Sequence, residues 1–342
     1  MVLYKSLIAL WCNLILPVTE IMPSSRFIVG LGIALLLANP VYPATTPPQR
    51  NDGISLAVSP NCGSLAGAPA DVNAGLLPLA AYRTLVTFGD SYTDGGIRNG
   101  SKLLPAVVIP PRPEAGGRTT NGPVWAEDLV ADTGALLKDY AFGGAVTDQR
   151  LWPSKANHSD FIGQVQIFLN QSNNLDPHTT LYSSFFGIND VGASLIDGTA
   201  NLPRAAQTII DQITLLTKPP TNARHFLVVE DYSRGKPTTA GEAFKQQYFS
   251  GLNTLRQTVP GFRVAFVDLK TIWEGVLGSD PGFAAFGYTS SGACTVSDQT
   301  TVGACSDAAH TFYWIPGHPS KETHRIMADY IEEALMHCEV SS

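Results

Sequence analysis

A serine lies directly behind a short apolar run in the first third of the chain. Residues 84–89 read TLVTFG, which is typical of a buried strand, and Asp90 and Ser91 follow at once. In an open α/β sheet, ligands bind beyond the carboxyl ends of the strands, so the Ser91 hydroxyl is a candidate nucleophile. The alternative is that Asp90 and Ser91 only cap the next helix, as such residues often do.

The serine needs a scaffold, and the sequence predicts one. Apolar runs predict strands at 84–88, 138–142, 181–186, 225–230 and 263–268. Amphipathic stretches predict helices at 124–132, 161–171, 202–216, 241–259, 271–277 and 321–336. Five repeats of strand and helix imply a parallel sheet with helices on both faces. Residues 95–122 are rich in Pro, Gly and Arg, and we expect a loop over the active edge of this sheet.

Two more predicted strands end in groups that could stabilise negative charge. Gly143 and Gly144 follow the second strand, where glycines let the backbone turn and approach a substrate closely. Asn189 follows the third strand, and its side chain can donate a hydrogen bond to an oxyanion. Taken singly, each has an ordinary alternative, a Gly-Gly turn or an Asx-turn.

Together these motifs resemble the GDSL (SGNH) family of esterases and lipases. Residues 88–94, FGDSYTD, resemble the first conserved block of that family, while 139–145, DYAFGGA, and 186–190, FGIND, resemble its second and third blocks. The segment is not the G-x-S-x-G elbow of another hydrolase class, because Thr93 stands where that motif needs its second glycine.

The resemblance implies a fold and a set of roles. The family fold is a three-layer α/β/α, flavodoxin-like domain with a mainly five-stranded parallel sheet, which we expect over residues 81–342. Ser91 would be the nucleophile. The Ser91 amide, the turn of Gly143 and Gly144, and the Asn189 side chain would form the oxyanion hole.

The base is harder to assign. Residues 314–320, WIPGHPS, resemble the last block of the family, in which an aspartate lies three residues before the histidine. His318 takes the histidine position, but Ile315 stands where the aspartate belongs. A backbone carbonyl or an acid from elsewhere in the chain would then orient His318. Asp307 and His310 have the D-x-x-H spacing and form the rival pair, although the setting before a helix favours His318.

The motifs GIND and RTTNGPVW look closest to secreted fungal members of carbohydrate esterase family 16 and to plant GDSL esterases. This resemblance implies a secreted serine esterase that hydrolyses short-chain, acetyl esters on carbohydrate through an acyl-serine intermediate. One alternative is a lipase or lysophospholipase of the same family. Another is a catalytically inactive protein that binds carbohydrate or cell wall, which Ile315 makes conceivable.

The composition agrees with one large α/β domain, since 44% of the residues are apolar and 15% are charged. The net charge is −7 and no Lys/Arg run occurs, so nothing indicates a nucleic-acid or anionic-membrane partner. No C-x-x-C or H-E-x-x-H motif supports metal or thioredoxin chemistry. We therefore expect no cofactor and no metal, a small-molecule or oligosaccharide ester as substrate, and a monomer.

We interpret residues 1–44 as a leader and 45–80 as an N-terminal extension. The apolar stretches 7–18 and 27–38 each fall short of the roughly 20 residues that a spanning helix needs. From Met22 onward the pattern is that of a secretory signal peptide. The alternative is an uncleaved signal anchor. If the leader is cleaved, we expect an extracellular protein without stable membrane association.

Cysteine use agrees with export. Outside the leader, four cysteines remain: Cys62, Cys294, Cys305 and Cys338. An even number in an exported chain suggests two disulfides, and we favour Cys294 with Cys305 and Cys62 with Cys338 among the three connectivities. Three sequons could carry glycans after export by a eukaryote: Asn99, Asn157 and Asn170.

Overall fold

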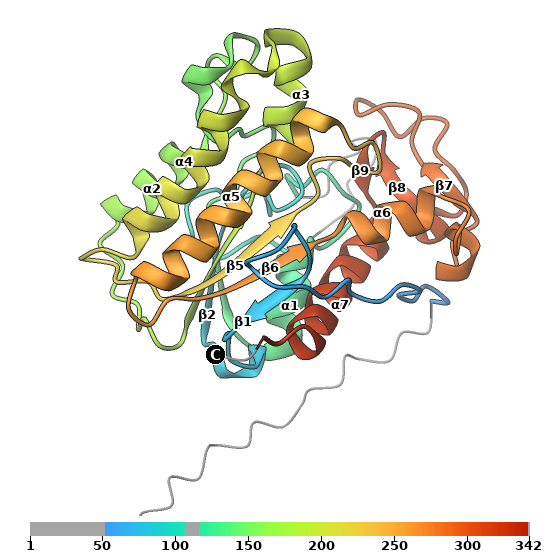
Figure 1. The fold of residues 1–342 in the computed structure, drawn as a ribbon. Coiled ribbons are helices and arrows are strands. Elements are labelled where there is room, and N and C mark those ends of the chain that lie inside the picture. The colour runs from blue at the N-terminus through green and yellow to red at the C-terminus, as the bar shows by residue number, and fades with distance from the viewer. Residues whose placement is uncertain (1–51, 107–115, 341–342) are drawn as a thin grey trace, which may run out of the picture. The chain divides into compact units, whose positions relative to one another are not determined.

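The computed structural model describes residues 52–106 and 116–340. Its centre is a six-stranded sheet in the order β1-β6-β5-β4-β2-β3 (Figure 1). The strands are β1 (Val72–Ala74), β2 (Thr84–Gly89), β3 (Leu136–Asp139), β4 (Thr180–Phe185), β5 (His225–Glu230) and β6 (Arg263–Asp268). The predicted leader, residues 1–44, lies outside the described residues.

Strands β2 to β6 run parallel, and only β1 pairs in the antiparallel direction, with β6. Numbered along the chain, the five parallel strands have the spatial order 2-1-3-4-5 of flavodoxin-like sheets. The predicted five-stranded parallel sheet is therefore confirmed. The sixth strand, β1, has three residues and is too short to stand out in the sequence.

Strand β3 was predicted at 138–142, and these bounds are wrong. It covers Leu136–Asp139 and stops because the Asp139 carboxylate accepts hydrogen bonds from the backbone of Gly95, at 2.7 Å, and of Ala141, at 3.0 Å. These bonds turn the chain away from the sheet. The following residues are therefore free to form the turn that contains Gly143.

Helices cover both faces of the sheet (Figure 1). They are α1 (Trp125–Thr133), α2 (Phe161–Asn170), α3 (Ile188–Asp197), α4 (Leu202–Leu216), α5 (Thr239–Thr258), α6 (Lys270–Leu277) and α7 (Lys321–His337). Successive strand residues face opposite sides. Accordingly, Val86 and Phe88 belong to one apolar cluster with α2, α4 and α5, and Leu85 belongs to the other with α1, α6 and α7. The three-layer α/β/α fold is confirmed.

Two features of the fold were not predicted. Helix α3 begins at Ile188, directly behind Gly187, so no polar linker marks its start in the sequence. A small second sheet contains β7 (Ser290–Ala293), β8 (Thr311–Ile315) and β9 (His318–Pro319). Strand β7 lies in a segment rich in Gly, Ser and Thr, and β9 has only two residues, so neither shows the alternation typical of a strand.

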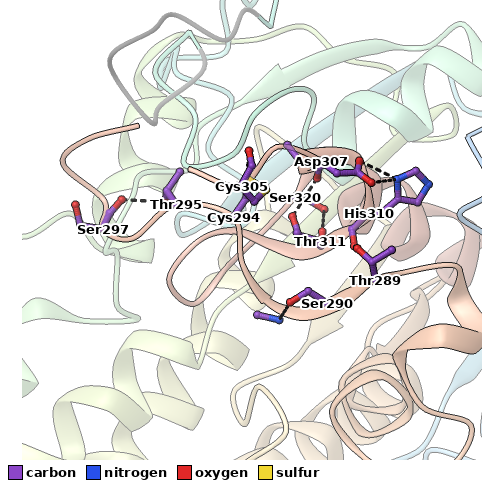
Figure 2. The surroundings of a disulfide bond; sticks show 12 residues. Thr289, Ser290, Cys294, Thr295, Ser297, Cys305, Asp307, His310, Thr311 and Ser320 are labelled. Atoms are coloured by element: carbon purple, nitrogen blue, oxygen red, sulfur yellow. Dashed lines mark hydrogen bonds and ion pairs between the residues drawn. A yellow bond between two sulfur atoms is a disulfide. The ribbon is translucent and has the colours of Figure 1, made fainter. Parts of the chain in front are cut away.

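Both predicted disulfides are present. Cys62 pairs with Cys338, which ties the start of the described chain to the end of α7, and Cys294 pairs with Cys305 beside the small sheet (Figure 2). Within the described residues, no helix is long and apolar enough to cross a membrane.

Candidate active site

The carboxyl ends of β2 and β4 meet at the point where the winding of the sheet reverses. From β2 the chain winds outward to β3, and then it crosses to β4 on the other side of β2. Ligands of doubly wound sheets bind at such a point. Ser91 follows β2 and Asn189 follows β4, and a hydrogen bond of 3.1 Å from Asn189 Nδ2 to Asp90 Oδ2 joins the two turns. The fold therefore brings two predicted site residues together.

His318 approaches Ser91 from the small sheet. Its Nε2 lies 3.0 Å from Ser91 Oγ, although the two residues are 227 positions apart. His318 begins β9, where it is paired with Ile315 of β8. Ser91 itself is only 7% exposed, so its hydroxyl has little contact with water.

The far nitrogen of His318 faces a backbone carbonyl. His318 Nδ1 lies 3.4 Å from the carbonyl oxygen of Pro316, which can only accept a hydrogen bond. This contact favours the tautomer with the proton on Nδ1, and it leaves Nε2 free to accept the Ser91 proton. Ile315 points instead into a small apolar cluster with Trp314 and Cys294. A carbonyl thus takes the place at which the family has a carboxylate.

Burial decides the charge state of His318. Burial lowers the pKa of the imidazole to about 4, and the positive charge of Arg234 lowers it further. The Pro316 carbonyl and Asp298 act in the opposite direction and raise it. His318 is therefore neutral at neutral pH, which is the form that can accept a proton.

The predicted oxyanion donors differ in their availability. Gly143 N–H already donates to Asp94 Oδ2 at 2.8 Å. The backbone N–H groups of Ser91 and Gly144 have no acceptor among the described residues, and Gly144 has the positive φ of +80° that glycine adopts readily. The Asn189 amide donates to both Asp90 and the Ala145 carbonyl. Ser91 and Gly144 are therefore the open donors.

The rival pair lies at the other end of β8. His310 Nδ1 is 2.9 Å from both carboxylate oxygens of Asp307 (Figure 2), and its Nε2 is 2.9 Å from the backbone carbonyl of Asp52. Both ring nitrogens are thus occupied in a contact that ties the start of the described chain to the small sheet. Neither contacts Ser91.

Sequence reasoning missed two residues that hold the serine turn. The Gln164 carboxamide, buried on α2, accepts from Gly89 N–H at 2.9 Å and donates to the Gly89 carbonyl at 2.7 Å. Thr119 Oγ1 donates to the Ser91 carbonyl at 2.8 Å. A polar residue on the apolar face of a predicted helix was the one available signal for Gln164, and Thr119 lies in the RTTNGPVW motif.

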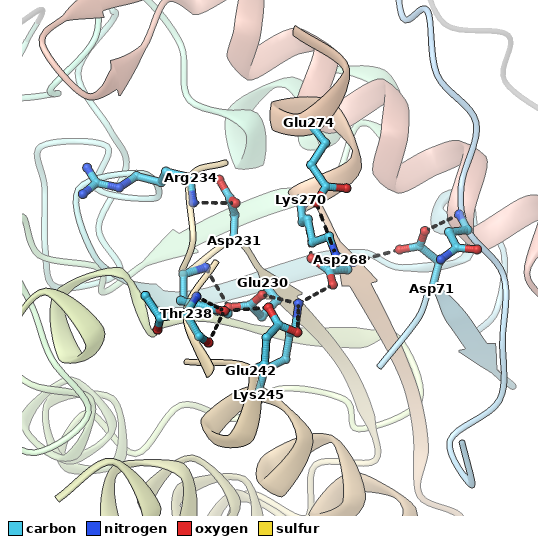
Figure 3. Close-up of polar contacts among 12 residues, drawn as sticks. Asp71, Glu230, Asp231, Arg234, Thr238, Glu242, Lys245, Asp268, Lys270 and Glu274 are labelled. Atoms are coloured by element: carbon cyan, nitrogen blue, oxygen red, sulfur yellow. Dashed lines mark hydrogen bonds and ion pairs between the residues drawn. The ribbon is translucent and has the colours of Figure 1, made fainter. Parts of the chain in front are cut away.

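A largely buried charge network lies at the carboxyl ends of β5 and β6 (Figure 3). Lys245 Nζ is 2.8 Å from Asp268, 3.4 Å from Glu242 and 3.7 Å from Glu230. Burial raises the pKa of Glu230 to about 8, in spite of Lys245. Because the acids face this one lysine, the network serves to anchor α5 to the sheet.

Comparisons with known proteins identify the family of the chain. Residues 85–331 match the family model of GDSL-like lipase/acylhydrolase. A stretch of 72 residues is 43% identical to an acetylesterase of Hypocrea jecorina, and it covers 20% of this chain and 20% of that relative.

Similar solved structures include a catalytic mutant of Axe2, an acetylxylan esterase from Geobacillus stearothermophilus. The two chains are 17% identical with a TM-score of 0.40, and the match covers 76% of this chain and 97% of that one. Another is a carbohydrate esterase family 2 enzyme of Corynascus thermopiles (Myceliophthora fergusii), with 17% identity, a TM-score of 0.42, and coverage of 74% and 67%. The family model matches residues 85–331, well over half of the chain, and the chain therefore belongs to the GDSL-like lipase/acylhydrolase family.

Proposed function

We propose that this protein is a secreted serine esterase that hydrolyses acetyl esters on carbohydrate. The single observation that carries the catalytic part is the 3.0 Å contact between Ser91 Oγ and His318 Nε2 at the switch point of the sheet. Serine hydroxyls act as nucleophiles when an adjacent base removes their proton. The neutral, partly buried His318 is such a base.

The reaction begins with attack of Ser91 Oγ on the ester carbonyl carbon, while His318 Nε2 takes the hydroxyl proton. The tetrahedral intermediate collapses as His318 returns that proton to the leaving alcohol, which leaves an acyl-serine. A water molecule then attacks the acyl carbon, His318 takes one of its protons, and the proton returns to Ser91 Oγ as the carboxylic acid leaves.

The backbone N–H groups of Ser91 and Gly144 are proposed to hold the oxyanion. Each is without an acceptor among the described residues, so neither has to break an internal bond to serve. Asn189 is proposed as the third donor, and it would exchange its bond to Asp90 or Ala145 for one to the oxyanion. Losing one such donor typically costs on the order of a hundredfold to a thousandfold in turnover.

The acetyl and carbohydrate specificity rests on the acetylesterase relative and on the sequence motifs. The test compares p-nitrophenyl acetate with butyrate and octanoate esters, and then measures acetate release from acetylated xylo-oligosaccharides, with Ser91→Ala as the blank. We expect the acetate ester and the oligosaccharide to be cleaved fastest. A preference for octanoate would indicate a lipase instead, and no turnover of any ester would indicate a binding protein.

Secretion is supported by two disulfides and by the leader pattern. Mass spectrometry of the protein from its native host should find no free thiol and a new N-terminus shortly after Ala38. An intact Met1 or free Cys294 would contradict this proposal.

A further inference from the structure

The turn that carries His318 is held from outside by two side chains. Tyr92 Oη donates to the carbonyl of Gly317 at 2.7 Å, and Arg234 Nη1 donates to the same oxygen at 3.4 Å, which is a weaker bond. These two residues come from the segment behind β2 and from the loop behind β5. The turn itself has no carboxylate at the position of Ile315.

The geometry of the turn links this carbonyl to the base. Gly317 lies between Pro316, whose carbonyl faces His318 Nδ1, and His318 itself. Its φ is +76°, and a Cβ at this position would lie 3.2 Å from Arg234 Nη1. The Gly317 carbonyl belongs to the peptide group that directly precedes His318. Fixing it therefore orients the backbone from which the imidazole projects.

Tyr92 is rigid enough to act as a support. It is fully buried, its ring stacks on Trp273 with centroids 6.0 Å apart, and it meets Phe185 edge-on at 5.9 Å. The His318 ring lies 5.7 Å from the Tyr92 ring. Burying a phenol is costly unless its hydroxyl forms a hydrogen bond, and the Tyr92 hydroxyl donates to the Gly317 carbonyl.

Arg234 adds a charge to this support. It has a positive φ of +46°, which is uncommon outside glycine, and its backbone N–H donates to Asp231. Figure 3 shows its guanidinium extending away from the Asp231 carboxylate. The guanidinium is directed to the Gly317 carbonyl, and Asp231 acts on it through its charge.

We propose that Tyr92 and Arg234 are positioning residues, which together clamp the Gly317 carbonyl and so orient His318 in place of the missing aspartate. The proposal rests on the proposed function, in which His318 is the base. The clamp would supply the orientation that a carboxylate gives to the histidine of a triad. It would not supply the negative charge that stabilises an imidazolium.

Other charged or titratable groups act on His318 and must be separated from the clamp. Asp298, on the loop closed by Cys294 and Cys305, raises the pKa of His318, while Arg234 lowers it. His324 on α7 is buried, which lowers its pKa to about 3 and keeps it neutral. Asp298 is thus the one competing acid in this set.

The test uses the variants Tyr92→Phe, Arg234→Gln and Arg234→Lys. The matched control is Tyr313→Phe, which removes a partly buried hydroxyl that accepts a hydrogen bond from Trp273 and has no bond to Gly317. Steady-state kinetics with p-nitrophenyl acetate over a wide pH range would give kcat, KM and the acid limb of kcat/KM. In parallel, ¹⁵N NMR of His318 in the Ser91→Ala background would give the fraction of the Nδ1–H tautomer.

We expect Tyr92→Phe to lower kcat about tenfold with KM within about twofold, and to reduce the Nδ1–H fraction. Arg234→Gln should move the acid limb upward by roughly 0.5 to 1 pH unit, because a positive charge near the imidazolium is lost, whereas Arg234→Lys should restore it. Tyr313→Phe should change none of these quantities.

The clamp is overturned if Tyr92→Phe and Arg234→Gln match Tyr313→Phe in kcat, acid limb and tautomer. It is also overturned if Asp298→Asn alone causes the tenfold loss, since Asp298 would then orient the base. If the wild-type protein hydrolyses no ester, the proposed function fails, yet the NMR measurement still decides whether the clamp sets the tautomer.

Discussion

The two ends of strand β8 each have a histidine, and they differ in what the histidine faces. His310 has an aspartate three residues before it, and both of its nitrogens are occupied, by Asp307 and by the Asp52 carbonyl. His318 lacks that aspartate, yet its Nε2 lies against the Ser91 hydroxyl. The D-x-x-H spacing therefore does not place a histidine beside the serine, because the partner of the second ring nitrogen depends on the position of the histidine in the fold.

The electrostatics of the two histidines diverge in the same way. The hydrogen bond with Asp307 raises the pKa of His310, which suits a partly exposed ion pair. Burial lowers the pKa of His318 to about 4. The pKa shifts therefore favour the charged form of His310 and the neutral form of His318.

The largest effects should follow from removing either member of the Ser91 and His318 pair. Ser91→Ala and His318→Ala are each expected to lower kcat by about a thousandfold or more, and the double variant should be little worse, because the two groups act as one unit. Activity with p-nitrophenyl acetate and circular dichroism measure the loss and the fold. His310→Ala is the control. If it is crippled while His318→Ala is active, the comparison is reversed.

A smaller loss is expected at the third proposed oxyanion donor. Asn189→Ala should lower kcat on the order of a hundredfold and leave KM nearly unchanged, since the donor acts chiefly in the transition state. Asn201→Ala, which removes a side-chain bond to the Leu151 carbonyl, is a control of the same chemistry on a neighbouring segment. An effect of Asn189→Ala confined to KM would mean that Asn189 binds the substrate ground state.

The pH dependence of kcat/KM should show which of the two histidines acts as the base, and it needs no variant that abolishes activity. The base must be unprotonated, so kcat/KM is expected to fall below about pH 4, the pKa of His318, and to be insensitive to His310→Ala. A limb near pH 7 would contradict this expectation. It would point to Asp90, whose pKa burial raises to about 7, and Asp90→Asn would then remove the limb.

The smallest effect should come from the rival pair. Asp307→Asn is expected to leave kcat within about twofold and to lower the free energy of unfolding by a few tenths of a kcal/mol, because the pair is partly exposed. Since Asp307 raises the pKa of His310, this contribution is complete below the unfolded histidine pKa of about 6.5 and disappears as the pH rises through the folded value. Urea unfolding on both sides of that range checks the sign; a larger loss at alkaline pH would contradict the ion pair.

Much of the fold was predictable because its signals are local. Strands β5 and β6 and helix α4 have the predicted bounds, since each is a short apolar run or an amphipathic stretch between clear turn residues. Helix α3 and the small sheet were missed, because α3 follows Gly187 without a linker and β8 is held by pairing with distant residues. Pairing of that kind leaves little trace in a short window of sequence.

The serine turn behind β2, the asparagine turn behind β4 and the family were predictable from the sequence, since each depends on a few adjacent residues behind a strand. Only the tertiary structure decided which histidine meets Ser91, across 227 positions, and which N–H groups stay open for an oxyanion. It also decided that the Pro316 carbonyl, and not an acid, faces His318 Nδ1. The physical reason is that hydrogen bonds are set by distance and direction in space, and neither can be read from spacing along the chain.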